Sequence, residues 1–125
     1  MSKQTRSIGH FVALILLGLW GILELGLAGT LTLAFWFVWL LYAAFLMWMK
    51  SGSTVGAWLV LAPPALWAGV IGANFVPQAL VALAGGSVNA HALAGVVLVT
   101  LPCGVAVAIH LGYAAAACNK WWAAS

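Results

Sequence analysis

Few side chains in this sequence could do chemistry, and Glu24 is the most conspicuous of them. It is the only Asp or Glu in the chain, and it stands inside an apolar stretch that runs from Gly9 to Met49. Placing an ionisable group in such a stretch is costly, so a functional role is the first hypothesis for it. A carboxyl group at this position could exchange protons with one side of a membrane, or it could bind a cation.

The polar residues expected near Glu24 are amides and hydroxyls. Helical rise from Arg6 places Glu24 about 27 Å further along its helix. By the same counting, Asn74, Thr30 and Thr32 fall at a similar height, so we expect a polar cluster of these residues with Glu24. Two interpretations remain open at this stage. The cluster is either a proton- or ion-exchanging site, or a hydrogen-bonded carboxyl group that serves only helix packing.

Histidines are the second group of candidates. His110 precedes Lys120 on the last expected helix, which places it about 15 Å into a bilayer by helical rise. An imidazole among small residues could ligate haem or donate a hydrogen bond to a quinone. By the same counting His10 lies about 9 Å shallower, so a bis-histidine haem between His10 and His110 would require tilted helices. The simpler interpretation of His110 is a hydrogen bond between helices, and His91 is expected in the headgroup region without a special role.

Several chemical signatures are missing from the sequence. No Cys or His cluster has the spacing of a zinc site, and no glycine-rich phosphate loop or pair of carboxylates is present. We therefore predict no metal site, no catalytic residues and no self-contained hydrolytic activity. Cys103 and Cys118 would lie more than about 20 Å apart on one helix, too far for a disulfide, so free thiols are expected.

Composition assigns the class of protein. Hydrophobic residues make up 66% of the 125 residues and charged residues only 4%, whereas about a quarter of the residues in a soluble domain are charged. Such a chain can face lipid but cannot cover a surface in water. We predict an integral membrane protein with a single domain over residues 1–125. Four cations are also too few for a nucleic-acid interface.

The apolar runs predict an all-α bundle of four membrane-spanning helices. The first run is about twice the length of roughly 20 residues that a spanning helix needs, so it must fold back, and the glycines at 26 and 29 are the place to do so. A kink is expected at Pro63-Pro64, and residues 78–84, after Pro77, are expected to form a short interfacial segment. The expected helices cover residues 9–27, 30–49, 55–76 and 89–117.

The cations predict the topology. With four spans, Lys3, Arg6, Lys50 and Lys120 all fall on one side, and the opposite connections carry no Lys or Arg. By the positive-inside rule, both termini are cytoplasmic. The expected location is a bacterial-type inner (plasma) membrane.

A stripe of small residues on the last helix predicts close packing. Thr100, Gly104, Ala108 and Gly112 follow one another at intervals of four residues, which aligns them on one face. Small residues at this spacing let two membrane helices approach closely. We expect this face to contact another helix.

Two short segments resemble a known family. Ile22-Leu23-Glu24 followed by Gly29-Thr30 is similar to the first helix of the small multidrug resistance transporters, and Trp67-Ala68-Gly69-Val70 is similar to part of their third. The sequence departs from that family in three respects: the glutamate lies closer to the helix end, the connections are shorter, and the flanking charges are one-sided. The chain is also similar in character to the small histidine-bearing membrane anchors of respiratory dehydrogenases and oxidases, although no motif of theirs is present. We assign no family on these grounds.

Three functions follow as expectations. The leading one is a non-catalytic subunit of an inner-membrane electron-transfer complex, contributing to a haem or quinone site through His110 and His10. The second is a small proton-coupled transporter or channel that uses Glu24 and acts as a homo-oligomer. The third is a membrane assembly or scaffold protein. In each case the expected partners are the lipid bilayer and either other membrane subunits or further copies of this chain.

Overall fold

The computed structural model describes the backbone of residues 3–24 and 31–124, and the side chains of residues 4–24 and 33–116. Apart from the short turns between helices, the described residues are helical, and none of them forms a strand. Four helical segments are long and apolar enough to cross a membrane, which confirms the predicted all-α fold with four membrane-length segments. These segments are Gln4–Leu23, Leu33–Lys50, Thr54–Ala84 and Ala90–Ala116.

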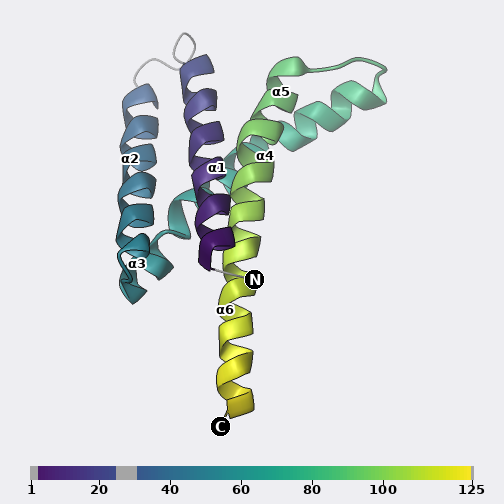
Figure 1. Ribbon diagram of the computed structural model, residues 1–125. Coiled ribbons are helices and arrows are strands. Elements are labelled where there is room, and N and C mark those ends of the chain that lie inside the picture. The colour runs from purple at the N-terminus through teal and green to yellow at the C-terminus, as the bar shows by residue number, and fades with distance from the viewer. Residues whose placement is uncertain (1–2, 25–30, 125) are drawn as a thin grey trace.

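The first two helices form an antiparallel pair (Figure 1). Helix α1 covers Lys3–Leu23 and helix α2 covers Leu31–Lys50. Helix α1 begins six residues before the predicted start at Gly9, because the predicted start followed hydropathy, whereas the polar Lys, Gln and Arg residues before it are good helix formers. The predicted end of this helix lies outside the described residues.

Close contacts at two glycines hold α1 against α2. A Cβ atom on Gly18 would lie 3.2 Å from Nε1 of Trp39, and the Phe35 ring lies directly against Gly21. The indole of Trp39 also donates a hydrogen bond of 2.9 Å to the backbone carbonyl of Leu14. The large aromatic rings of α2 therefore pack against glycines on α1.

The third membrane segment is interrupted near its start. Helix α3 covers Thr54–Leu59, and helix α4 covers Ala62–Ala84 after a break at residues 60–61. The side chain of Ser53 caps α3 by accepting a hydrogen bond from the Gly56 N–H. The two prolines expected to cause a kink lie in the first turn of α4, where a missing N–H costs little.

Helix α4 continues where the sequence predicted its end. The expected boundary before Pro77 is wrong, and residues 78–84 belong to α4 instead of forming a separate interfacial segment. A proline inside a helix removes one backbone hydrogen bond, but its apolar neighbours here are good helix formers and the helix resumes. The last turns of α4 run away from the other helices before the chain turns back to α5 (Figure 1).

The fourth segment is one continuous helical path with a wide turn inside it. It consists of α5 (Ala90–Gly95), the π-helical turn η1 (Val96–Thr100) and α6 (Leu101–Ala124). The N–H of Leu101 bonds to the carbonyl of Val96, which is the longer spacing of a π-helix. Pro102 follows at once, and its ring would crowd a normal helical turn, so the wide turn makes room for it. The path extends past the predicted end at Ala117.

The core lies where α1 is packed between α2 and the last segment. Its members are apolar and come from all four segments: Ala13, Leu14, Leu17, Trp20, Tyr42, Leu46, Met49, Val60, Ile71, Val99, Cys103 and Ala106. The start of α1, the end of α2 and the end of α6 lie at the same end of the bundle (Figure 1). We call this the basic end, defined by Arg6 and Lys50, and the opposite end the acidic end, defined by Glu24.

The predicted stripe of small residues divides between the inside and the outside of the fold. Thr100 packs against α4, where a Cβ atom on Gly72 would lie 3.3 Å from Cγ2 of Thr100. Gly104 and Ala108 are exposed, and a Cβ atom on Gly104 would meet nothing within 4 Å. Gly112 is half-buried. Beyond Thr100, a packing role for this stripe toward another chain stays a prediction.

Candidate functional site

Three polar side chains from three helices meet inside the basic half of the bundle. Nδ1 of His10 on α1 lies 2.7 Å from the hydroxyl of Tyr42 on α2. Nε2 of His10 lies 2.9 Å from Nδ1 of His110 on α6. His10 and Tyr42 are 0% exposed and His110 is 3% exposed, so the bonds of this triad lie in the core.

The close approach of α1 and α6 brings the two histidines together. A Cβ atom on Gly9 would lie 3.4 Å from Cδ1 of Ile109 and 3.8 Å from Cα of Ala106, so the helices nearly touch beside His10. The expected difference in depth between the histidines does not exist. That estimate treated Lys120 as the edge of the membrane, whereas α6 continues to Ala124 and extends past the start of α1 (Figure 1).

The positions of the protons in the triad follow from the requirement that buried hydrogens be paired. Tyr42 has one hydroxyl hydrogen, and His10 is its only hydrogen-bond partner in the described part of the chain. The hydroxyl therefore donates to Nδ1 of His10, whose Nε2–H then donates to Nδ1 of His110. This order leaves His110 with an Nε2–H group that is free to donate to a ligand.

The geometry of the triad does not fit a bis-histidine haem. Both ring nitrogens of His10 already have partners within the triad. A haem ligated by His10 and His110 would have to lie between their rings, yet two of their nitrogens are only 2.9 Å apart. A hydrogen bond between helices thus occupies the place of a bis-histidine haem, while a cofactor contact of His110 alone stays a prediction.

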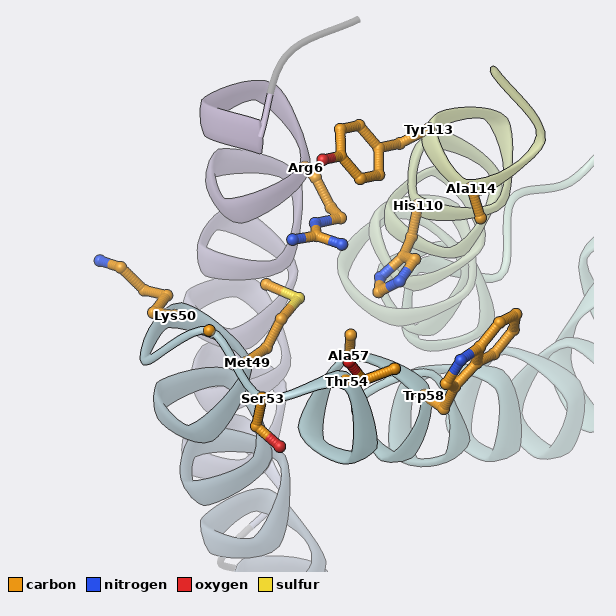
Figure 2. Close-up of a pocket in the computed structure, with 11 residues that line it drawn as sticks. Arg6, Met49, Lys50, Ser53, Thr54, Ala57, Trp58, His110, Tyr113 and Ala114 are labelled. Atoms are coloured by element: carbon orange, nitrogen blue, oxygen red, sulfur yellow. The ribbon is translucent and has the colours of Figure 1, made fainter. Parts of the chain in front are cut away.

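A cavity of about 410 Å³ lies beside the triad at the basic end. Its walls include Arg6, Trp58, His110 and Tyr113, and we call it the Arg6 cavity. Figure 2 shows the Arg6 and His110 side chains pointing toward the same space. The Arg6 guanidinium lies 4.4 Å from the centre of the Tyr113 ring, whereas Lys50 points outward and its Nζ lies 5.9 Å from the centre of the Phe11 ring.

At the acidic end, Glu24 is paired with a residue that the sequence analysis did not assign to it. Oε1 of Glu24 lies 2.6 Å from Nε2 of His91, with side-chain exposures of 21% and 48%. The His91 ring lies 5.3 Å from the Trp20 ring and 5.1 Å from the Phe75 ring, measured between ring centres. The pair thus joins the end of α1 to the start of α5.

The other residues expected around Glu24 do not take part in this pair. The Asn74 side chain is exposed and donates a hydrogen bond of 2.8 Å to the carbonyl of Val70 on its own helix, so the predicted contact with Glu24 is replaced by His91. Thr30 lies outside the described residues, and Thr32 lies on α2 with its side chain outside them. The sequence does contain a signal for this pair. Glu24 and His91 are both expected at the same end of the bundle, and an acid and a base placed together can form an ion pair.

An aromatic cavity of about 380 Å³ lies next to the pair. Its walls include Glu24 and four rings, those of Trp20, Phe35, Trp67 and Phe75, and we call it the aromatic cavity. The indole Nε1 of Trp67 is buried and has no hydrogen-bond partner in the described residues. The cavity therefore combines flat apolar walls with one carboxyl group, and the unpartnered Trp67 N–H is buried within one wall.

The two polar sites are separated by apolar packing. Between His10 and Glu24, the buried face of α1 carries Ala13, Leu14, Leu17 and Trp20. Fourteen residues of helix correspond to about 21 Å. Within the described residues no group of three or more His, Cys, Asp or Glu side chains could hold a metal ion. The chain thus has two separate sites rather than one path across the bundle.

Comparison with known proteins adds no relative to this picture. No protein-family model matches the chain, and no curated protein sequence or solved structure matches it either. The function is therefore inferred from the residues and cavities of the chain itself.

Proposed function

We propose that this protein is a non-catalytic membrane subunit of an electron-transfer assembly, and that its aromatic cavity holds the ring of a quinone-type ligand. One observation carries the proposal: an aromatic cavity within the bundle has the Glu24–His91 pair at its edge. Ligand sites of this kind are mostly apolar, with a few polar groups that orient the ligand. The volume of about 380 Å³ lies within the usual range for such sites.

The walls of the cavity match the shape and the polarity of a quinone ring. Aromatic rings such as Trp20, Phe35 and Phe75 stack favourably on a flat conjugated ligand. The N–H of Trp67 is buried in the wall without a partner, and a small turn of the ring would bring it to one quinone carbonyl. Burying such a donor without a partner costs free energy, so a bound carbonyl would stabilise the site.

The Glu24–His91 pair would supply the proton chemistry. Reduction of a quinone to a quinol takes up two electrons and two protons. In this proposal the electrons come from a redox group of a partner subunit, and His91 or Glu24 passes protons to the ligand oxygen. Both side chains are partly exposed, so they can be reloaded from water. This chain would bind the ligand and exchange protons without transferring electrons itself.

The test combines ligand binding with mass analysis of the gently solubilised protein. A short-tailed benzoquinone should quench tryptophan fluorescence saturably. The Trp67→Phe variant, which keeps a ring but loses the donor, should bind it about fivefold more weakly, as expected for one lost hydrogen bond. The matched control is Trp58→Phe. Trp58 lies exposed at the basic end, so this substitution makes the same chemical change away from the aromatic cavity. Equal affinity in the two variants, or a purified protein with neither partner chains nor quinone, contradicts the proposal.

A second function is favoured by the carboxyl group in the same cavity. An aromatic box with a carboxylate also suits a lipophilic organic cation, which would make the protein a proton-coupled transporter or channel. A cation would have to displace His91 from Glu24, so the geometry supports this function less well. If the protein is a transporter, Glu24→Gln should abolish proton-coupled flux of an organic cation in liposomes. Unchanged flux in that variant would reject the transporter.

A further inference from the structure

The Arg6 cavity is at the opposite end of the bundle from the aromatic cavity and serves no step of the proposed function. Its most unusual feature is Arg6, whose Nε atom is buried and has no hydrogen-bond partner in the described residues. The neighbouring His110 presents the free Nε2–H group that the triad leaves unused. Arg6 and His110 therefore bring N–H groups to the wall of one cavity, and Nε of Arg6 has no acceptor in the described residues.

No acidic side chain lies at this end of the protein. Glu24 is the only acidic side chain in the sequence, and it is paired at the acidic end. The guanidinium of Arg6 rests against the Tyr113 ring, which attracts a cation but cannot accept its N–H groups as a carboxylate would. A partly buried guanidinium without a counter-charge is unfavourable. The cavity is thus complementary to an anion from outside the chain.

The setting of the cavity points to a lipid as the source of that anion. The cavity lies where the spans Gln4–Leu23 and Leu33–Lys50 both have their basic ends. Tyr113 and the 60% exposed Trp58 line it, and Tyr and Trp are the residues that favour the headgroup level of a membrane. Basic pockets between membrane helices are known to bind the headgroups of anionic lipids.

We propose that the Arg6 cavity binds the phosphate of an anionic phospholipid. The guanidinium of Arg6 donates to two phosphate oxygens in the planar, two-pronged manner that distinguishes arginine from lysine. The Nε2–H of His110 donates to a third oxygen. The acyl chains lie along the exposed apolar side chains next to the cavity, those of Trp58 and Leu59 on α3.

The triad makes His110 a fixed donor in this site. Its Nδ1 is held by His10, and His10 is held by Tyr42, so the His110 ring keeps one orientation with its Nε2–H toward the cavity. A donor that is already oriented loses little freedom when it binds its ligand. The buried triad and the lipid site would therefore form one structure that ties three helices to a headgroup.

Native mass spectrometry of the protein in mixed detergent and lipid tests this proposal. The wild-type protein should retain phosphatidylglycerol in preference to phosphatidylcholine, and Arg6→Gln should lower that preference about tenfold, as expected for a lost charge-assisted pair. Lys50→Gln is the matched control: Lys50 also borders the cavity, but its side chain extends away from Arg6 and His110 toward Phe11, so the substitution removes the same charge from the same end without removing a phosphate donor. Equal losses in the two variants overturn the proposal, because they indicate general attraction rather than a site.

Two further arms make the result decisive. Arg6→Lys keeps the charge and so guards against a folding defect, and it should lose most of the preference because an ammonium lacks the planar fork. Retention of the full preference in Arg6→Lys overturns the bidentate site. Competition with inorganic phosphate separates the two sources of the anion: millimolar phosphate should leave the bound lipid in place. Displacement of the lipid by phosphate would indicate a site for free anions and overturn the lipid assignment.

Discussion

Tyr42 illustrates how one hydroxyl group can organise a buried polar network. Its O–H donor fixes the tautomer of His10, and His10 in turn fixes that of His110. Inside an apolar bundle such bonds have no competition from water, but measured values between membrane helices remain modest, at about 1 kcal/mol each. The main consequence of removing one is that its partner is left buried and unpaired.

We expect Tyr42→Phe to destabilise the protein by about 1–2 kcal/mol, because it leaves Nδ1 of His10 without a donor in the core. The measurement is the free energy of unfolding, obtained by raising the mole fraction of a denaturing detergent in mixed micelles. Tyr113→Phe is the control, since it keeps the ring that contacts Arg6 and should change stability by less than about 0.5 kcal/mol. Equal effects of the two substitutions would show that the hydrogen bonds of the triad do not contribute to the free energy of unfolding.

The Glu24–His91 pair belongs to the same scale but should contribute less. Its partners are partly exposed, and such pairs typically contribute up to about 1 kcal/mol. A double-mutant cycle with Glu24→Gln and His91→Ala should give a coupling free energy of about 0.2–1 kcal/mol, measured from unfolding of the four proteins. A coupling near zero would mean that the two side chains do not interact, and the polar edge of the aromatic cavity would lose its basis.

At the scale of elements, the packing of α3 against the end of α2 depends on Gly56. A Cβ atom on Gly56 would lie 2.8 Å from the backbone N of Met49, and backbone atoms cannot move aside as a flexible side chain can. We expect Gly56→Ala to destabilise the protein by about 1–3 kcal/mol through overpacking. Gly69→Ala on α4 is the matched control, because nothing lies within 4 Å of its added Cβ atom.

The two alanine variants should move in opposite directions. Replacing an exposed helical glycine by alanine removes flexibility from the unfolded chain and favours helix by up to about 1 kcal/mol. Thermal unfolding followed by helical circular dichroism would report both changes. A stable Gly56→Ala protein would mean that α3 does not pack against the end of α2 as closely as the structure has it.

The elements were predictable from the sequence to the extent that hydropathy determines them. Four apolar runs give four membrane-length segments, because only a helix satisfies its backbone within lipid. The sequence misplaces the boundary at Pro77 because the rule that proline ends a helix comes from soluble proteins. It misplaces the boundary at Ala117 because hydropathy falls there, although the helix continues. The π-helical turn before Pro102 leaves no hydropathy signal at all.

The sites were less predictable, because they depend on which helix faces which. His10 and His110 were both recognised as candidates, but counting residues from Lys120 gave them different depths, and only the packing of α1 against α6 makes them neighbours. His91 was set aside, although Glu24 needed a basic partner at its own end. Height along the helix alone predicts a contact between Asn74 and Glu24, but height does not say which way a side chain points.

At the scale of the whole molecule, the ends of the bundle differ in charge. Arg6 and Lys50 lie at one end and Glu24 with His91 at the other. We expect the positive-inside rule to place the basic end in the cytoplasm. The loops that follow α2 and α4 would then lie on opposite sides of the membrane, each with an exposed serine: Ser51 at the basic end and Ser87 beyond α4.

Thiol labelling of intact cells checks that topology. In a Cys118→Ser background, Ser87→Cys should react with a membrane-impermeant maleimide added outside, whereas Ser51→Cys should react only after the cells are opened. Cys103 is a buried free thiol and should stay silent in both. The reverse labelling pattern would invert the topology, and labelling of both positions from outside would rule out a third membrane-spanning segment.

The apolar middle of α1 has a consequence for how the protein behaves in an energised membrane. Ala13, Leu14 and Leu17 separate the triad from Glu24 by about 21 Å of packing in which the described residues have no charged side chain. If the chain spans the membrane as we propose, this layer would act as electrical insulation, and protons at each end would equilibrate only with the water on their own side. A membrane subunit built in this way can serve proton chemistry at one surface and hold a lipid at the other without short-circuiting the gradient between them.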